Sequence, residues 1–202
     1  MIIRRAKIDD AYEAAELICM AWQESAYVLA GSSNKSEVMG VIENFFKQPK
    51  NSLSYQYIDV AEGKNGIAGL ILSFPWDFTP RLNKPIIEEL PDIYRSSQLD
   101  FKEKVIPMIK TKEAKPDEYY VDSVAVYPKY RGHGIADGLL KVAKIKSATY
   151  GFDKMSLIVK PENKRAISLY KKHGYTVRGK LTLGDKIYLS MVKSIDSEKA
   201  LA

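Results

Sequence analysis

The sequence has few of the residues that build disulfides and metal centres. It contains one cysteine, Cys19, and two histidines, His133 and His173, in 202 residues. A single cysteine cannot form a disulfide within the chain, and a structural zinc site needs more cysteine and histidine ligands than are present. We therefore expect neither disulfides nor a bound metal.

Long apolar runs are also missing. No stretch approaches the roughly 20 apolar residues of a membrane-spanning helix, and the first residues, MIIRRAKIDD, lack the apolar core of a signal peptide. We predict a cytoplasmic protein with no membrane partner. Hydrophobic residues make up 46% of the chain and charged residues 28%, the composition of a globular protein with a substantial core.

Charge is divided unevenly along the chain. Residues 1–128 hold 15 lysines and arginines against 19 aspartates and glutamates, whereas residues 129–202 hold 16 against 6. This excess of basic residues predicts an anionic partner for the C-terminal part. Nucleic acid is the less favoured partner, because the lysines fall on helix faces around a glycine turn and are not interleaved with aromatic residues. We expect no nucleic-acid binding.

The hydrophobic pattern predicts a mixed α/β domain over residues 1–194, followed by a flexible tail at 195–202. Strands are predicted at 1–8, 54–62, 66–74, 118–127, 154–160, 175–183 and 186–195. Helices are predicted at about 11–22, 32–48, 96–110, 135–150 and 164–173. Residues 75–116 are predicted to be an insertion that contains one of these helices.

A glycine turn joins the strand at 118–127 to the helix that begins at Ile135. Gly132 and Gly134 have no Cβ atoms, so an anion can approach their backbone closely. The start of a helix adds unpaired N–H groups and the positive end of the helix dipole. The stretch predicts a phosphate-binding turn, although two glycines at this place could also serve only a tight turn.

Three kinds of phosphate-binding loop contain glycines at a comparable place. A P-loop needs a lysine followed by serine or threonine after its last glycine, and the sequence has none there. A dinucleotide fingerprint needs GxGxxG, whereas Gly138 follows Gly134 one residue too late and the next strand ends in Lys160. The stretch 131–136, RGHGIA, resembles the R/Q-x-x-G-x-G/A pyrophosphate loop of the GCN5-related N-acetyltransferases, the GNAT family.

The flanking sequence strengthens this resemblance. SVAVYPKYRGHGIADGLL is similar to the strand, proline and loop of the family, and KPENKRAISLYKKHGYTVRG carries its Asn, Ala, Leu-Tyr and Gly-Tyr signature. The resemblance covers 119–193 closely and 1–74 in the order of elements. It implies an α/β (α+β) GNAT fold: a central mixed, mostly antiparallel twisted sheet of about seven strands flanked by helices, with a helical insertion between the third and fourth strands.

The resemblance also implies acetyl-CoA as co-substrate and assigns residues to it. Backbone groups of three residues would pair with the pantetheine arm as an added strand: Val124, Ala125 and Val126. Backbone N–H groups of the turn would hold the pyrophosphate: Arg131, Gly132, His133, Gly134, Ile135, Ala136 and Asp137. Asn163 would contact the pantetheine or adenosine side, and Tyr170 would point at the thioester sulfur.

Acetyl transfer to an amine needs a base and an acid. A primary alkylamine has a pKa of roughly 10, so removing its proton at pH 7 costs about 4 kcal/mol. Asp122 and Glu118 are the candidate bases, acting directly or through water. Side chains alternate between the two faces of a strand, so these two residues are expected on the same face. We favour Asp122 as the base. The Tyr170 phenol can give a proton to the departing thiolate. A hydrogen-bonding role for Asp122 and a packing role for Tyr170 are the alternatives.

The resemblance places the acceptor between the first helices and the loops around the sheet, near Trp22, Tyr27, Phe74 and Trp76. Aromatic rings beside acids suit a cationic amine, although aromatic clusters at the end of a sheet also form cores. We predict an acetyl-CoA-dependent N-acetyltransferase that acts on a small primary amine by direct attack in a ternary complex. A non-catalytic acyl-CoA sensor is the alternative, and a homodimer is expected because family members are often dimers.

Overall fold

The computed structural model describes residues 1–64, 66–95 and 100–195, and its centre is one seven-stranded sheet in the order β1-β2-β3-β4-β5-β7-β6. The strands are β1 (Ile2–Arg5), β2 (Ile58–Gly63), β3 (Gly66–Pro75), β4 (Tyr119–Val126), β5 (Lys154–Val159), β6 (Thr176–Leu183) and β7 (Lys186–Ser194). Every pair of neighbours is antiparallel except β4 and β5, which are parallel. The predicted mixed, mostly antiparallel sheet is confirmed.

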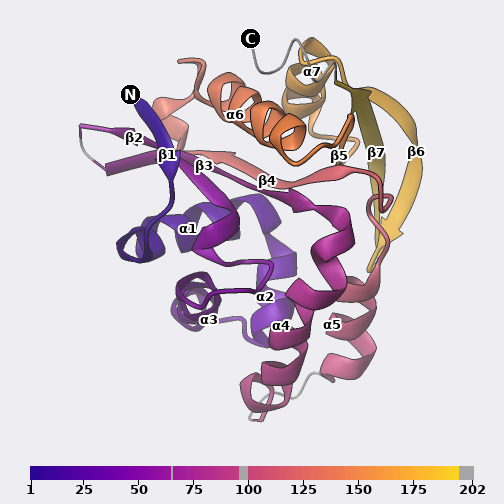
Figure 1. The fold of residues 1–202 in the computed structure, drawn as a ribbon. Helices are drawn as coiled ribbons and strands as arrows, with labels where there is room; N and C mark the ends of the chain where they lie inside the picture. The colour runs from indigo at the N-terminus through magenta and orange to yellow at the C-terminus, as the bar shows by residue number, and fades with distance from the viewer. Residues whose placement is uncertain (65, 96–99, 196–202) are drawn as a thin grey trace.

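Helices cover both faces of the sheet (Figure 1). They are α1 (Ala11–Trp22), α2 (Glu24–Ala30), α3 (Lys35–Lys47), α4 (Thr79–Ile93), α5 (Phe101–Lys110), α6 (Ile135–Thr149) and α7 (Lys164–Lys172). One core cluster joins α1, α3, α4 and α5 to their face of the sheet, and a second joins α6 and α7 to the other. Within the described ranges, no helix is long and apolar enough to cross a membrane.

The insertion between β3 and β4 holds two helices where one was predicted. Helix α4 was missed because Pro85 and Pro91 lie inside it, and each removes a backbone donor. Its buried residues Leu82, Ile86 and Leu90 recur every four positions, and their packing outweighs the local preference. The short helix α2 was also missed. The predicted start of α5 at 96–99 and the tail at 196–202 lie outside the described residues.

Two irregularities of β4 shape the centre of the molecule. The parallel pairing of β4 with β5 consists of Tyr119 with Met155 and Tyr120 with Ser156, and beyond these pairs the two strands diverge (Figure 1). On its other side β4 has a β-bulge against β3, where Leu72 lies opposite Ser123 and Ser73 lies opposite Val121. Asp122 is the extra residue of this bulge.

Candidate active site

A cavity of about 600 Å³ follows the divergence of β4 from β5. At the C-terminal end of β4 its walls are the glycine turn and the starts of α6 and α7. At the N-terminal end they are the last turn of α1, the end of β3, and the insertion. The lining at the first end, here called the cofactor end, includes Arg131, Gly132, Gly134, Ile135, Ala136, Asp137 and Asn163. The lining at the second, the acceptor end, includes Trp22, Phe74, Trp76, Glu113, Tyr120, Asp122 and Tyr188.

The glycine turn has the backbone that its sequence predicts. Gly132 and Gly134 have φ angles of +85° and +73°, a region that favours glycine. A Cβ atom built at either position meets no heavy atom within 4 Å, so open space lies above the turn. Gly134 is the N-cap of α6, and the first N–H of α6 to bond back into the helix is that of Gly138, at 3.0 Å from Gly134 O. The preceding N–H groups of α6 are therefore available to an anion.

The charged residues of the turn are held by the protein. Arg131 Nε donates to the carbonyl of Val126 at 3.0 Å, which fixes the turn to the end of β4. Asp137 Oδ1 lies 2.6 Å from Lys172 Nζ and 3.1 Å from His173 Nε2 on the α7 side. The hydrogen bond from Lys172 holds the pKa of Asp137 below its usual range. This pairing offsets the one negative charge in the turn. His133 is exposed and is not among the residues that line the cavity.

The predicted pantetheine strand lies along the cavity. Val124, Ala125 and Val126 all line it, and β5 pairs with β4 only at Tyr119 and Tyr120 within the described chain. The edge of β4 beyond Tyr120 therefore faces the cavity instead of a neighbouring strand, and an extended ligand could add there. Asn163 also lines the cavity, and its Oδ1 accepts a hydrogen bond from the Ala166 N–H at 3.1 Å as the N-cap of α7.

Asp122 lies in the middle of the cavity wall. Its Oδ1 accepts hydrogen bonds from Trp22 Nε1 at 2.9 Å and from Ser123 Oγ at 2.7 Å. Burial raises the pKa of Asp122 above its usual range, while the two hydrogen bonds act in the opposite direction. Asp122 is thus a carboxyl group in a water-poor site with two fixed donors on one oxygen. Its second oxygen remains for a ligand.

Tyr170 enters the cavity from α7 and is 8% exposed. Its ring packs edge-on against Tyr175 with centroids 5.9 Å apart. Burial raises the pKa of Tyr170 to about 12, so the phenol keeps its proton at any physiological pH. A protonated hydroxyl on the cavity wall is what a proton donor requires.

A second cavity carboxylate, Glu113, was not predicted. It belongs to the connection from α5 to β4, lines the acceptor end, and accepts a hydrogen bond from the Tyr120 hydroxyl. Burial and the nearby charge of Asp122 raise the pKa of Glu113 to about 8, against the effect of the Tyr120 hydrogen bond. Its residue type alone gave no signal, because only the folded insertion brings it to β4.

Two candidates from the sequence lie elsewhere. Glu118 is buried in an ion pair with Arg178 of β6 and accepts a hydrogen bond from the Lys115 N–H at 2.9 Å. It lies away from the cavity lining, so the expectation that it shares a face and a site with Asp122 is corrected. Tyr27 packs against Ala26, Ala30 and Val38 outside the lining, because α2 presents it to α3. Trp22, Phe74 and Trp76 do line the acceptor end.

A match to a known protein family identifies the family of this chain. Residues 13–175 match the acetyltransferase (GNAT) family. The chain belongs to the GNAT family. Among the described residues of this GNAT chain, no three His, Cys, Asp or Glu side chains are grouped as metal ligands.

Solved structures and curated sequences resemble this GNAT chain to different extents. An N-acetyltransferase from Staphylococcus aureus Mu50 is 28% identical, with a TM-score of 0.73 over 95% of this chain and 100% of that one. Another acetyltransferase structure has a TM-score of 0.76 over 97% and 100% of the two chains, and at 21% identity this likeness shows the fold alone. An acetyltransferase of Sodalis glossinidius is 35% identical over 65 residues, which are 32% of this chain and 44% of the relative. The chain thus matches about half the length of such curated relatives.

Proposed function

We propose that this GNAT protein transfers an acetyl group from acetyl-CoA to the primary amine of a small molecule, by direct attack in a ternary complex. The observation that carries the proposal is the alignment of three features in one cavity: the N–H groups of the glycine turn, the free edge of β4, and the carboxyl of Asp122. The likeness to the Staphylococcus aureus N-acetyltransferase over nearly the whole chain supports the same reaction class.

The chemistry of the donor fits the walls of the cavity. A pyrophosphate carries negative charge, which suits the start of α6, where backbone N–H groups and the helix dipole meet open space. Arg131 and Arg165 line the same end and add positive charge. A pantetheine arm carries two amides, which can bond to the backbone of Val124 to Val126 as a neighbouring strand would.

The protein's own groups then move the protons. Asp122 receives the proton of the bound ammonium, directly or through one water, and leaves a neutral amine. The amine nitrogen bonds to the acetyl carbonyl carbon, the carbon–sulfur bond breaks, and Tyr170 gives its proton to the departing sulfur. The attacking nitrogen is now cationic, and its second proton passes through solvent to the phenolate and restores Tyr170. The proton on Asp122 is released to solvent, so the net reaction frees one proton. Much of the rate gain in such a complex comes from holding the two reactants side by side.

Ligand-induced thermal stabilisation, followed by turnover, tests the proposal. Acetyl-CoA and CoA should raise the melting temperature by mass action, whereas NAD and ATP should not. Thiol release from acetyl-CoA should then depend on an added primary amine. No stabilisation by acetyl-CoA or CoA would overturn the proposal. Stabilisation without turnover of any amine would favour an acyl-CoA sensor. A cytoplasmic location and a homodimer stay predictions.

A further inference from the structure

The acceptor end of the cavity brings together two carboxyl groups from parts of the chain far apart in sequence. Asp122 comes from the bulge of β4 and Glu113 from the insertion. Tyr120 connects them, since it lies two residues before Asp122 and its hydroxyl donates to Glu113 Oε2. Both carboxyls have one oxygen held by protein donors and line the same space.

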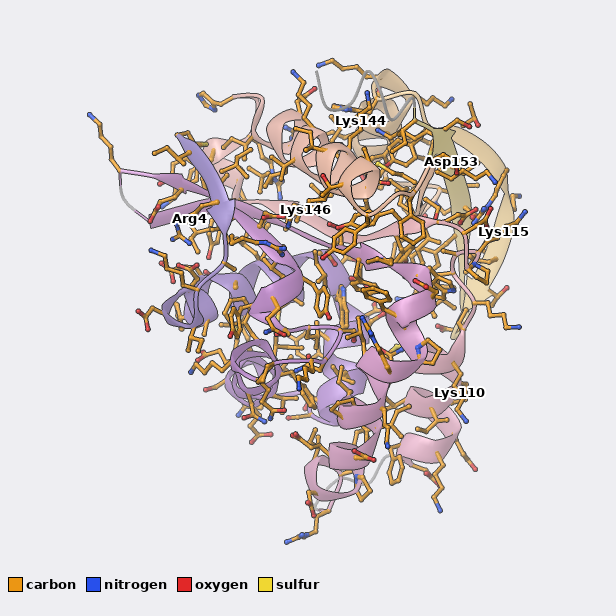
Figure 2. The ribbon with its side chains drawn as sticks, viewed as in Figure 1. Arg4, Lys110, Lys115, Lys144, Lys146 and Asp153 are labelled. Carbon is orange, nitrogen blue, oxygen red and sulfur yellow. The ribbon has the colours of Figure 1, made fainter. Side chains whose placement is uncertain are left out.

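Positive charge is sparse at the acceptor end of the cavity. Within the described part of the chain, the lysines and arginines that line the cavity are Arg131, Lys160 and Arg165. Arg131 and Arg165 belong to the cofactor end, whereas the Lys160 ammonium donates to Gln23 Oε1 at 2.6 Å, next to Trp22. Lys112 and Lys115, the neighbours of Glu113 along the chain, are exposed. Figure 2 shows Lys115 and Lys110 at the outer rim of the molecule. The titratable groups that face Glu113 are therefore Asp122 and Tyr120 of β4 and Tyr188 of β7.

The remaining wall of the acceptor end has an apolar strip beside polar side chains, which are Gln23, Ser25, Ser52, Thr79 and Asn83. Trp76 packs edge-on against Tyr120 with centroids 5.0 Å apart, and Phe74 does so at 6.1 Å. Beyond these rings the lining continues along α2, α4 and α5 with Leu29, Ile86, Met108 and Ile109. A ligand that fills this space can bury an apolar body against the strip, which favours binding.

We propose that the acceptor is a monoamine, a primary ammonium on an apolar body with no carboxylate and no second cation, and that Asp122 and Glu113 together bind its ammonium. This inference rests on the proposed function and deepens it. Asp122 keeps its place as the proton acceptor, and Glu113 is the specificity-determining partner. The insertion that departs from the minimal family pattern thereby supplies half of the acceptor site.

The chemistry of the site separates this class from two other groups of amines. A free amino acid would place its own carboxylate beside Asp122 and Glu113, where like charges disfavour binding. The described lysine near that end, Lys160, is bonded to Gln23. A diamine would place its second ammonium against Ile86, Met108 and Ile109, where no described acid lines the wall. A monoamine matches both the two carboxyl groups and the apolar strip.

Matched pairs of amines test the proposal at saturating acetyl-CoA. 2-Phenylethylamine and phenylalanine differ by one carboxylate, and hexylamine and 1,6-diaminohexane differ by one amine. In each pair we expect the monoamine to have the higher kcat/KM, by about 30-fold or more. Equal or better turnover of phenylalanine, the diamine or a peptide with a free N-terminus would overturn the monoamine assignment and leave the proposed function standing. Failure of acetyl-CoA to bind would instead overturn the proposed function.

A substitution at Glu113 tests its part in the site. Glu113→Gln keeps the acceptor oxygen for Tyr120 and removes the negative charge that Glu113 carries once it is ionised. Measured above about pH 8, KM for 2-phenylethylamine should therefore rise about 10-fold while kcat changes less than about 2-fold. In the unsubstituted protein KM should fall as pH rises toward 8, because Glu113 ionises while the ligand stays cationic; this trend should be lost in the variant. Glu103→Gln, on the exposed side of α5, is the matched control. An unchanged KM in Glu113→Gln, or no calorimetric binding of 2-phenylethylamine to the CoA-loaded protein, would overturn the inference.

Discussion

The indole Nε1 of Trp22 lies 2.9 Å from Asp122 Oδ1 and 2.9 Å from Ser123 Oγ, so one N–H at the end of α1 contacts two successive residues of β4. Successive residues of a regular strand point to opposite faces of a sheet. Here both point toward α1, because the bulge opposite Leu72 and Ser73 shifts the alternation by one residue. Asp122 shares its face with Tyr120 two residues earlier, and the bulge turns Ser123 to the same face. The hydrogen bond from Trp22 favours the charged form of Asp122.

This contact predicts the behaviour of Trp22→Phe. Phenylalanine keeps much of the packing and removes the donor, so the charged form of Asp122 loses a hydrogen bond and its pKa rises. The pH above which kcat/KM levels off should therefore move to higher pH, and kcat/KM at pH 7 should fall by roughly 10-fold. The affinity for acetyl-CoA, measured by calorimetry, should stay the same. A pH profile identical to that of the unsubstituted protein would separate Trp22 from the charge of Asp122.

The glycine turn predicts that a charged side chain at position 134 weakens acetyl-CoA binding more than a small uncharged one does. Its φ of +73° makes any side chain strained, by about 1 kcal/mol, so Gly134→Ala measures the backbone cost alone. Gly134→Glu adds a carboxylate in the open space above the turn and should weaken acetyl-CoA binding at least about 30-fold more than alanine does. Isothermal calorimetry on the two variants gives the comparison. Equal losses in both would mean that backbone strain, not occupation of the anion site, explains the effect.

Sequence patterns predicted the parts of the molecule that depend on local rules. The largely buried strand β4, the helix start after Gly134 and the hairpin at Gly184 each follow from a few adjacent residues, and the structure has them. The residues that line the cofactor end were predicted for the same reason, since a single continuous loop carries most of them.

The acceptor end depends on contacts that no local pattern contains. Glu113 reaches the cavity because α5 and the chain after it return to β4, and Ser123 joins Asp122 on the α1 face because of a bulge. Strict alternation would have placed Glu118 with Asp122, whereas the chain just before β4 turns Glu118 toward Arg178. Helix α4, with its internal prolines, forms only because Leu82, Ile86 and Leu90 are buried together.

Tyr170 and Tyr175 pack against each other, and substituting each in turn tests whether Tyr170 acts in catalysis or only in packing. Tyr170 lines the cavity and Tyr175, its edge-on neighbour, is buried with no described hydrogen-bond partner for its hydroxyl. Tyr170→Phe should lower kcat by roughly 10–1000-fold with unchanged acetyl-CoA affinity, because the proton donor to sulfur is lost. Tyr175→Phe should leave kcat unchanged and keep or raise the free energy of unfolding. Full activity in Tyr170→Phe would assign Tyr170 to packing.

Glu118 offers a test that separates stability from catalysis. Its side chain is 1% exposed; burial alone would raise the pKa of Glu118, but the ion pair with Arg178 and the Lys115 N–H hold that pKa below its usual range. A pKa lowered by folding stabilises the native state above the unfolded value of about 4.3, and this contribution is lost as pH falls through the folded pKa. Glu118→Gln should therefore reduce the free energy of unfolding by about 2 kcal/mol at pH 7. The difference from the unsubstituted protein should shrink below about pH 4, as measured by urea denaturation.

The same variant should leave catalysis intact. Because Glu118 lies outside the cavity lining, kcat/KM of Glu118→Gln for a turned-over amine should stay within about 2-fold of the unsubstituted protein below the melting temperature, with the same pH profile. Asp122→Asn should do the opposite, with kcat lowered by about 100-fold or more and the acetyl-CoA affinity kept. A large loss of kcat in Glu118→Gln, with stability preserved, would return Glu118 to the role of base and would require β4 to present a different face to the cavity in solution.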